Sequence, residues 1–430
     1  MLATAPADTA ASLWMALPFV LLLGMIAAGP LAFHRWWERF YPHVSVGLGA
    51  ITASYYLMVL RQPAPLLHVA EEYFSFIALI GSLYVIAGGI HIRVKGEGTP
   101  LANCVFLLIG AIAANFIGTT GASMLLIRPW IRVNRYRVTT HHVVFFIFIV
   151  SNVGGCLTPI GDPPLFLGFL KGVPFWWVIQ HCWEAWLIVM GWLLGIFYVM
   201  DRRNFLRAPK EIRDRETQRE EWHFGGLRNL LFLAIALGGV FLPLGWREAA
   251  LVAAALASWF STPKKVHRDN AFNFHPIAEV AWLFIGIFCT MLPALQWLEA
   301  NAAGLGLHSP SQFFWLTGSL SGVLDNAPTY LAFLAAAFGL VGMDFDERSQ
   351  VTDFASRHPD LLMAISLGSV FFGAMTYLGN GPNLMVKAIA TSQRAGPPGF
   401  VGYIVRYALP ILVPVFLLIS LLFFSRWRVF

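Results

Sequence analysis

Charged residues are scarce in this chain of 430 residues. Asp, Glu, Lys and Arg make up 12% of it, whereas soluble domains carry about 25%. Hydrophobic residues make up 57%, and the mean hydropathy is +0.66. Apolar runs of about 20 residues recur along the chain, and each is long enough to cross a bilayer. The composition therefore excludes a soluble core with a single anchor and predicts an all-α polytopic membrane protein.

Cysteines and catalytic patterns are also sparse. The four cysteines lie in apolar stretches without metal-type spacing, which argues against a disulfide framework or a zinc site. His141 and His142 are adjacent, and adjacent residues do not face one way on a helix, so a shared metal site is not expected there. No nucleophile–base pair is evident, which argues against an enzyme. The net charge of +6 does not suggest nucleic-acid binding.

Ten apolar segments are predicted to cross the membrane as helices. They lie near residues 13–33, 44–60, 71–92, 141–170, 176–200, 226–244, 248–262, 276–297, 361–392 and 400–424. The first has no basic region before it, so it reads as a retained span and not as a cleaved signal peptide. Glu72 and Glu279, at the starts of comparable spans, are expected at the interface.

Two further apolar stretches, 100–127 and 312–342, are interrupted by polar tips. The tips read "GTTGAS" (118–123) and "VLDNAPT" (323–329). Each half is too short to span the membrane, so both stretches are predicted to be re-entrant hairpins. Non-helical backbone at that depth is tolerated only inside protein or beside a watery cavity.

The distribution of basic residues predicts the topology, because Lys and Arg favour cytoplasmic loops. If the charged linker 201–223 is cytoplasmic, most of the 29 Lys and Arg fall in inner segments. The halves 1–200 and 224–430 are then predicted to have opposite orientations, as an inverted-topology repeat. The expected location is a bacterial inner membrane, with lipid as the surrounding partner.

One motif occurs twice. "GCLTPIGDPP" begins at Gly155 and "GAMTYLGNGP" begins at Gly373, and both match G-x-x-T-x-x-G-[D/N]-x-P without a gap. These motifs interrupt the spans 141–170 and 361–392. Interrupted helices at corresponding places in two halves are the best sequence indication of a transporter's midplane binding site.

The broken helices expose backbone groups that can bind ions. A break leaves N–H and C=O groups without partners. Carbonyl ends can coordinate a cation, and N–H ends favour an anion. Asp162, before Pro163 and Pro164, can instead serve only as a helix cap, and so can Asn380. A membrane carboxylate is costly, which favours a functional role for Asp162.

The hairpin tips offer further ligands. Each tip is predicted to face the broken helix of its own half, which gives two related clusters that bind coupling cations. Capping alone remains an alternative for Asp325 and Asn326. Lys387 either snorkels toward the cytoplasm or acts as a counter-ion. The full predicted ion- or substrate-binding set is Thr119, Thr120, Gly121, Ser123, Ser151, Asn152, Gly155, Thr158, Asp162, Asp325, Asn326, Thr329, Thr376 and Asn380.

The segments "SNVGGCLTPIGDPP", "LDNAPT" and "TYLGNGPN" resemble the ion transporter superfamily. The closest likeness is to the branch of citrate transporters and D-type sodium/proton antiporters. The resemblance implies a scaffold domain, a mobile transport domain, elevator-type alternating access and a homodimer. It also implies sodium sites at the tips and breaks, with Asn152, Asn326 and Asn380 as ligands beside Asp162 and Asp325. Dicarboxylate carriers differ, because their tips use Ser-Asn-Thr without acids.

Two functions remain open from the sequence. Burial of an aspartate favours its protonation or its pairing with a cation. A site that holds either a proton or sodium, but not both, would exchange them, with Asp162 and Asp325 as titrating ligands. The alternative is a sodium- or proton-coupled citrate or dicarboxylate transporter, in which Thr and backbone N–H groups hold the anion. Sodium is expected as the coupling or transported ion, and no cofactor is predicted. A membrane enzyme or a passive channel fits the pattern less well.

Overall fold

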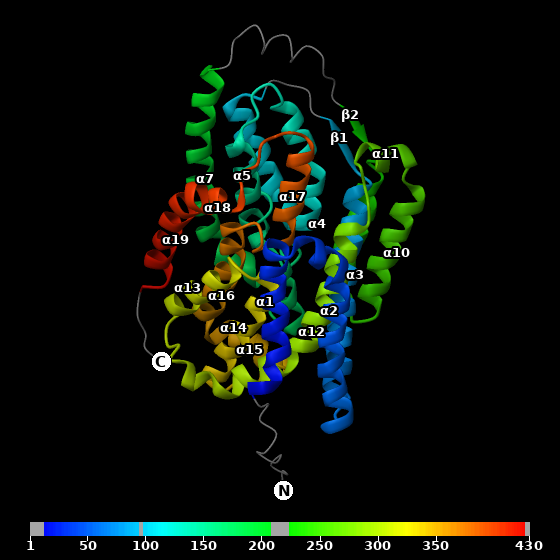
Figure 1. The fold of residues 1–430 in the computed structure, drawn as a ribbon, viewed down its shortest axis with the longest axis vertical. Coiled ribbons are helices and arrows are strands. Elements are labelled where there is room, and N and C mark those ends of the chain that lie inside the picture. The colour runs from blue at the N-terminus through cyan, green and yellow to red at the C-terminus, as the bar shows by residue number, and fades with distance from the viewer. Residues whose placement is uncertain (1–12, 94–97, 208–222, 426–430) are drawn as a thin grey trace.

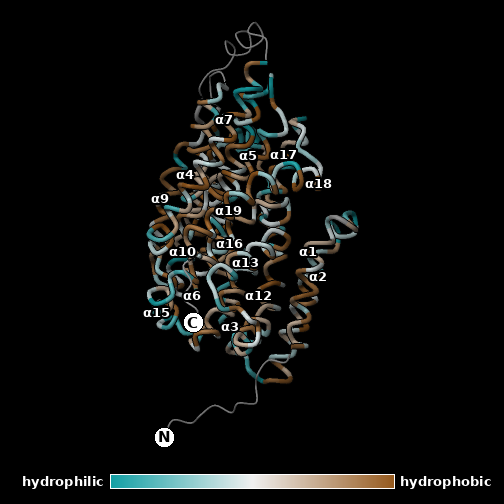
Figure 2. The backbone as a smooth tube through the Cα atoms, turned by 90° about the vertical axis from the view of Figure 1, so that its left-hand side faces the viewer, coloured by the Kyte–Doolittle hydropathy of each residue, from teal (hydrophilic) through white to brown (hydrophobic). Residues whose placement is uncertain are grey.

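The computed structural model describes residues 13–93, 98–207 and 223–425, and this part of the chain is a helical bundle (Figure 1). Two short strands, β1 (His91–Arg93) and β2 (His223–Gly225), pair antiparallel, with His91 opposite Gly225. Most residues of the predicted linker 201–223 lie outside the described part. Brown, apolar segments run through most of the bundle in Figure 2, as expected for a protein in a bilayer.

The described part of the first half contains seven α-helices. They are α1 (Leu17–Ala32), α2 (His34–Ser54), α3 (Ala64–Gly88), α4 (Pro100–Val133), α5 (Thr140–Ile149), α6 (Pro163–Lys171) and α7 (Trp177–Arg207). A 3-10 turn at Leu13–Ala16 precedes α1, a π-helical turn at Tyr55–Val59 follows α2, and a 3-10 turn at Val153–Leu157 lies between α5 and α6. In Figure 2, α1 and α2 stand beside the main bundle.

The second half contains α9 (Asn229–Gly239) to α19. The others are α10 (Trp246–Ser261), α11 (Lys264–Asp269), α12 (His275–Asn301), α13 (Pro310–Ser321), α14 (Asn326–Val341), α15 (Arg348–Arg357), α16 (Pro359–Phe372), α17 (Gly381–Ser392), α18 (Phe400–Tyr403) and α19 (Leu409–Phe423). Short 3-10 turns at Ala302–Leu305 and Gly373–Met375 follow α12 and α16, and a π-helical turn at Ile404–Ala408 joins α18 to α19.

The described part has seven helices long and apolar enough to cross a bilayer, or eight if the pair Arg348–Arg357 and Pro359–Met375, bent by 97°, counts as one span. Ten spans were predicted. The predicted spans 226–244 and 248–262 fold as α9 and α10, which have only 11 and 16 residues. At 1.5 Å per residue, neither covers a hydrocarbon core of about 30 Å.

Both predicted hairpins are present. Within α4, Gly118 adopts φ 73° and ψ 155°, which ends one helix and starts another. Asn103 and Asn134 then exchange hydrogen bonds of 2.8 and 3.1 Å, although a straight helix would hold them about 46 Å apart. In the second hairpin, the rings of Phe313 in α13 and Phe333 in α14 lie 6.4 Å apart. Each pair of half-helices therefore runs antiparallel.

Both predicted broken helices are present, and their breaks have matching local structure. Thr158 and Thr376 each have φ −138° and an extended ψ. A Cβ on Gly379 would lie 2.7 Å from the carbonyl oxygen of Gly373, and a Cβ on Gly161 would clash with the carbonyl of Gly155. The sequence motif is thus a repeated loop in which two glycines meet closely.

The helices form two packed groups. We call α1, α2, α3, α9, α10 and α12 the span group, and α4 to α7, α13, α14 and α16 to α19 the hairpin group. Stacked rings of Phe76 and Phe284, with centroids 4.6 Å apart, join α3 to α12 inside the span group. The two groups meet mainly where α12 packs on α14 and α3 packs on α4.

Candidate functional site

Asp162 is the centre of a buried polar cluster in the hairpin group. Its side chain is 1% exposed. Its Oδ1 accepts hydrogen bonds from Thr119 Oγ1 at 2.8 Å and Asn380 Nδ2 at 2.9 Å, and its Oδ2 accepts one from Asn326 Nδ2 at 2.6 Å. The three donors come from the first hairpin tip, the second broken helix and the second hairpin tip. One carboxylate therefore joins all four interrupted segments.

The local sequence explains why the Asp162 carboxylate points inward. Asp162 is the residue before α6, but its side chain makes no capping hydrogen bond to that helix. Pro163 and Pro164 occupy the first two helical positions and have no N–H groups to offer. The carboxylate is therefore free to accept from other segments, so capping does not account for this residue.

A second layer of amides joins the two broken helices. Asn152 Nδ2 donates to the carbonyl of Ile147 and to Asn383 Oδ1, both at 2.8 Å. Asn383 Nδ2 in turn donates to the carbonyls of Gly373 at 2.8 Å and Thr376 at 2.9 Å. The buried amides thus satisfy carbonyls that the breaks leave without helical partners.

Asn380 and the predicted serines link this layer to Asp162. Besides its bond to Asp162, Asn380 Nδ2 lies 3.2 Å from the carbonyl of Ser151 and 3.3 Å from Asn152 Oδ1. The hydroxyls of Ser151 and Ser123 lie 2.7 Å apart. The structure therefore brings together these four predicted residues and Asp162.

Several other predicted residues support the loops without contacting the Asp162 carboxylate. Asp325 caps α14, because its side chain accepts from the backbone N–H of Ala327 at 3.1 Å. Thr329 donates to the carbonyl of Asp325 at 2.9 Å, and Thr376 Oγ1 accepts from Leu378 and Gly379. Capping is thus the role that the geometry shows for Asp325.

The remaining predicted residues pack around the first tip. Gly155 lies against Thr119, where a Cβ would stand 2.6 Å from the threonine methyl. Gly121 faces Ala87, and Thr120 is half-buried. Thr158 donates to the carbonyl of Asn115 at 2.6 Å. These residues set the shape of the tip and the first loop.

The prediction of two separate clusters, one in each half, is wrong. The first tip does face its own broken helix, through Thr119 and Asp162. The second tip also faces its own broken helix, where Gly322 lies against Met375. Its Asn326, however, donates to Asp162 in the other half. The reason is tertiary, because the two breaks pack against each other and a single carboxylate serves as the common acceptor.

Sequence reasoning missed two supporting amides, Asn115 and Asn383. Asn115 Nδ2 donates to the carbonyl of Gly154 at 2.7 Å, and its Oδ1 accepts from the N–H of Leu157 at 2.9 Å. Asn383 holds the second break, as described above. Each is an amide inside an apolar helix, where an unsatisfied amide would be costly, and this signal could have identified both.

One buried acceptor in the cluster has no partner. Asn326 is 0% exposed, and its Oδ1 forms no hydrogen bond, although its Nδ2 donates to Asp162. Among the described contacts of Asp162, none comes from Lys or Arg. Lys387 instead lies 4.4 Å above the ring of Tyr377. The cluster therefore combines a carboxylate with a free oxygen ligand and lacks a basic partner.

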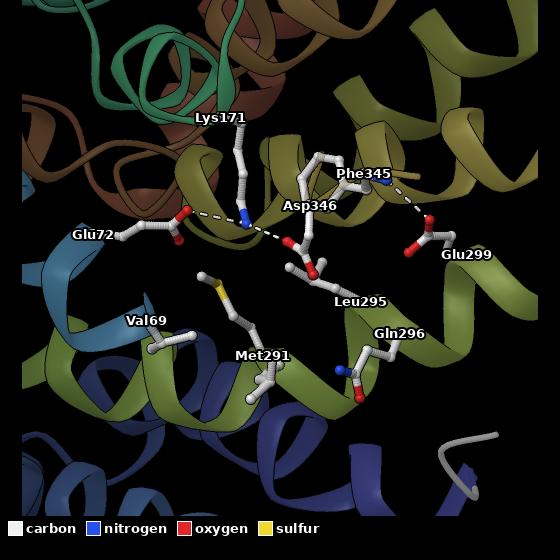
Figure 3. Close-up of a pocket in the computed structure, with 10 residues that line it drawn as sticks. Val69, Glu72, Lys171, Met291, Leu295, Gln296, Glu299, Phe345 and Asp346 are labelled. Atoms are coloured by element: carbon white, nitrogen blue, oxygen red, sulfur yellow. Dashed lines mark hydrogen bonds and ion pairs between the residues drawn. The ribbon is translucent and has the colours of Figure 1, made fainter. Parts of the chain in front are cut away.

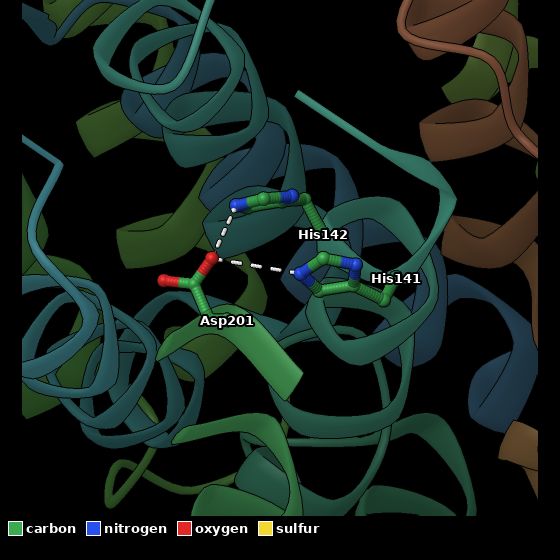
Figure 4. A group of neighbouring side chains, drawn as sticks. All are labelled: His141, His142 and Asp201. Atoms are coloured by element: carbon green, nitrogen blue, oxygen red, sulfur yellow. Dashed lines mark ion pairs between the residues drawn. The ribbon is translucent and has the colours of Figure 1, made fainter. Parts of the chain in front are cut away.

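A second cluster, at the start of α5, contains His141, His142 and Asp201 (Figure 4). The Nε2 atoms of His142 and His141 lie 3.0 and 3.5 Å from Asp201 Oδ1, and the two rings stack at 4.3 Å. The prediction that these neighbours face different ways is wrong. At the helix start their side chains bend to the same carboxylate.

Hydrogen bonding argues against a metal ion between these residues. The backbone N–H of Thr139 donates to His142 Nδ1 at 3.2 Å, so that nitrogen is an acceptor and the ring proton of neutral His142 lies on Nε2. A metal would require a bare Nε2. Arg137 also forms two hydrogen bonds to the Asp201 carboxylate, and Asn103 donates to it at 2.9 Å. This network ties α4, α5 and α7 together.

Comparison with known proteins identifies the family. The model of the family described as "Putative citrate transport" matches residues 8–424. The chain belongs to this family. A 46 kDa membrane protein of Mycobacterium leprae (strain TN) is 24% identical over 322 residues, which cover 71% of this chain and 72% of the relative.

Further mycobacterial relatives are named as transporters. An uncharacterized transporter of Mycobacterium tuberculosis (strain CDC 1551 / Oshkosh) is 24% identical over 328 residues, again with coverage of 71% and 72%. The chain is thus an integral membrane protein of a transporter family.

Proposed function

We propose that the protein is a secondary active transporter that exchanges sodium ions for protons at Asp162. The observation that carries the proposal is the geometry of this carboxylate. It is buried, it is contacted by all three other interrupted segments, and the unpartnered Oδ1 of Asn326 belongs to one of the amides that contact it. Carboxylate, amide and carbonyl oxygens are the ligands that hard cations prefer.

The helix starts at the cluster are poor sites for an anionic substrate. A helix N-terminus binds anions through its free N–H groups. Pro163 and Pro164 remove two such groups from α6, and Pro382 removes one from α17. In α14, the N–H of Ala327 is already bound by Asp325. The carboxylate of Asp162 already supplies negative charge near these helix starts. It would repel an anionic substrate and attract a cation, which favours a cation as the transported species.

Exchange follows from competition at a single carboxylate. Burial disfavours an unpaired negative charge, so Asp162 would be stabilised by either a proton or a sodium ion. The two cations cannot both occupy it. If the hairpin group moves relative to the span group and exposes the cluster to each side in turn, sodium and protons move in opposite directions. Elevator-type motion, a homodimer and a cytoplasmic linker 201–223 remain predictions within this proposal.

Coupled citrate or dicarboxylate transport is the second candidate. The family description, which names citrate transport, supports it as well as it supports sodium–proton exchange. It would need donors for several carboxylate groups of the substrate. Lys387 is the candidate cation, but its contact is with Tyr377. The substrate would then enlist Thr119, Asn326 and Asn380 as neutral donors.

Purified protein in vesicles with an internal pH-sensitive dye distinguishes the two candidates. We expect sodium alone to move protons, and Asp162→Asn to abolish that movement. Proton or sodium movement that requires citrate or a dicarboxylate would overturn the exchange proposal and support the second candidate. Asp353→Asn, which neutralises an exposed carboxylate on α15, is the control for the loss of one charge.

A further inference from the structure

An ion-paired lysine lies in a pocket at the end of α6, the helix that begins beside Asp162. Lys171 is the last residue of α6 and is 8% exposed. Its Nζ lies 3.0 Å from Glu72 Oε1 in α3 and 2.7 Å from Asp346 Oδ1, in the segment after α14. Figure 3 shows the lysine between the two carboxylates. Glu72 is 7% exposed, so its carboxylate is buried inside the protein, and its predicted place at the membrane interface stays a prediction.

The Lys171–Glu72 pair crosses the boundary between the two groups of helices. Glu72 belongs to the span group, whereas Lys171 belongs to the hairpin group. By contrast, the Asp201 network joins α4, α5 and α7, which all belong to the hairpin group. Of the ion pairs in the described part of the chain, Lys171–Glu72 is therefore the one that joins the two groups.

The segment around Asp346 strengthens the same crossing. The ring of Phe345 lies 4.8 Å from Lys171 Nζ, and the N–H of Phe345 donates to Glu299 in α12 at 3.0 Å. His68, one turn before Glu72, lies 3.2 Å from that carboxylate. A small pocket opens beside these groups, lined also by Val69 of α3 and by apolar side chains of α12.

We propose that Lys171 is a latch that holds the hairpin group against the span group in the conformation described here. The inference rests on the proposed alternating access, because relative motion of the groups must separate Lys171 from Glu72. Separation removes the basic partner of the buried Glu72 carboxylate, which then keeps only His68. It also leaves Lys171 with Asp346 alone. Loss of a partner from a buried charge is costly. The latch therefore favours the described conformation until substrate binding offsets that cost.

The test measures opening of the pocket directly. Val69, which lines the pocket and is 5% exposed, is changed to Cys in a background whose four native cysteines are replaced. A membrane-impermeant maleimide then reports how often the pocket opens. Lys171→Gln and Glu72→Gln are each expected to raise the labelling rate roughly tenfold, and the double variant to raise it no further, since both remove one interaction.

Controls separate the latch from general destabilisation. Lys264→Gln, which neutralises an exposed lysine on α11, and Lys171→Arg, which keeps the charge, should label at the unmodified rate. If Lys171→Gln does not fold, Glu72→Gln provides the test, because it removes the same ion pair and leaves Lys171 bound to Asp346. Unchanged labelling rates in Lys171→Gln and Glu72→Gln would overturn the latch. So would a double variant whose increase in rate equals the product of the two single increases.

The labelling needs no sodium and no transport, so it is independent of the proposed function. If Lys171→Gln and Glu72→Gln label faster but the vesicles show no sodium–proton exchange, the latch is supported and the exchange proposal is refuted. If the vesicles show exchange but the two variants label at the unmodified rate, the exchange proposal is supported and the latch is refuted.

Discussion

Asp162→Asn tests the proposed cation site with little disturbance of its structure. The substituted side chain keeps an oxygen where Thr119 and Asn380 donate. Its new NH₂ group would face the NH₂ group of Asn326. Asn326 can turn its amide and present its unpartnered Oδ1 instead. The turn satisfies Oδ1 but leaves the NH₂ group of Asn326 without an acceptor. We therefore expect the unfolding free energy without sodium to fall by about 1–2 kcal/mol.

The effect in sodium should be larger. A ligand that binds only the folded protein stabilises it by RT ln(1 + [L]/Kd), which is about 2.7 kcal/mol at a concentration of 100 Kd. Asp162→Asn removes the only charge that contacts the cluster's donors, so this stabilisation should be lost. Asp162→Ala is a poorer test, because it would leave three donors unpaired at about 1–3 kcal/mol each.

The assay is thermal unfolding of the purified protein over a sodium series, with choline replacing sodium to hold the ionic strength constant. The unmodified protein and Asp353→Asn should gain stability as sodium rises, and Asp162→Asn should not. An Asp162→Asn protein that gains as much as the unmodified protein would refute the assignment of the cation to this carboxylate.

Three further substitutions test the structure around the site. Gly161→Ala should prevent folding, because its Cβ would overlap the backbone carbonyl of Gly155, whereas Gly24→Ala has free space and should be tolerated. The yield of monodisperse protein measures both outcomes. A normal yield for Gly161→Ala would contradict the close contact between the glycines. Asn383→Ala leaves three buried partners unpaired and should lower the unfolding free energy by about 3 kcal/mol or more, measured by denaturant unfolding; a loss below about 1 kcal/mol would count against it. Asp201→Asn should lower the unfolding free energy by about 3–5 kcal/mol, because the buried charge of Arg137 loses its counter-charge. A chelator should leave the unfolding temperature of the unmodified protein unchanged. Destabilisation by the chelator would indicate a metal ion bound at this cluster.

The breaks could be predicted from sequence because their causes are local. Gly118 adopts a positive φ that favours glycine, and Pro163 and Pro164 begin a helix because proline fits the first turn. The repeated motif doubles this signal. Hairpin tips and broken helices therefore appear where the sequence placed them.

The convergence of the segments on Asp162 could not be predicted in the same way. Spacing within each half says nothing about how the halves pack, so the direct contact between Asn326 and Asp162 depends on tertiary structure. The predicted span 226–244 is longer than α9, since apolar composition continues past the residues that form regular helix, whereas α10 has nearly the predicted bounds but is too short to span. The pairing of Lys171 with Glu72 could not be predicted either, because each residue resembles an ordinary interfacial charge until its partner is known.

The two copies of the motif differ at the position that matters most for charge. Where the first copy has Asp162, the second has Asn380, and the two side chains meet at 2.9 Å. Two carboxylates at that distance would repel strongly in a medium of low dielectric constant and would share a proton. The amide removes the repulsion and supplies a donor, so the pair leaves one titratable group at the meeting point of both halves. A site built this way would take up one proton or one monovalent cation at a time, as exchange at a single carboxylate requires.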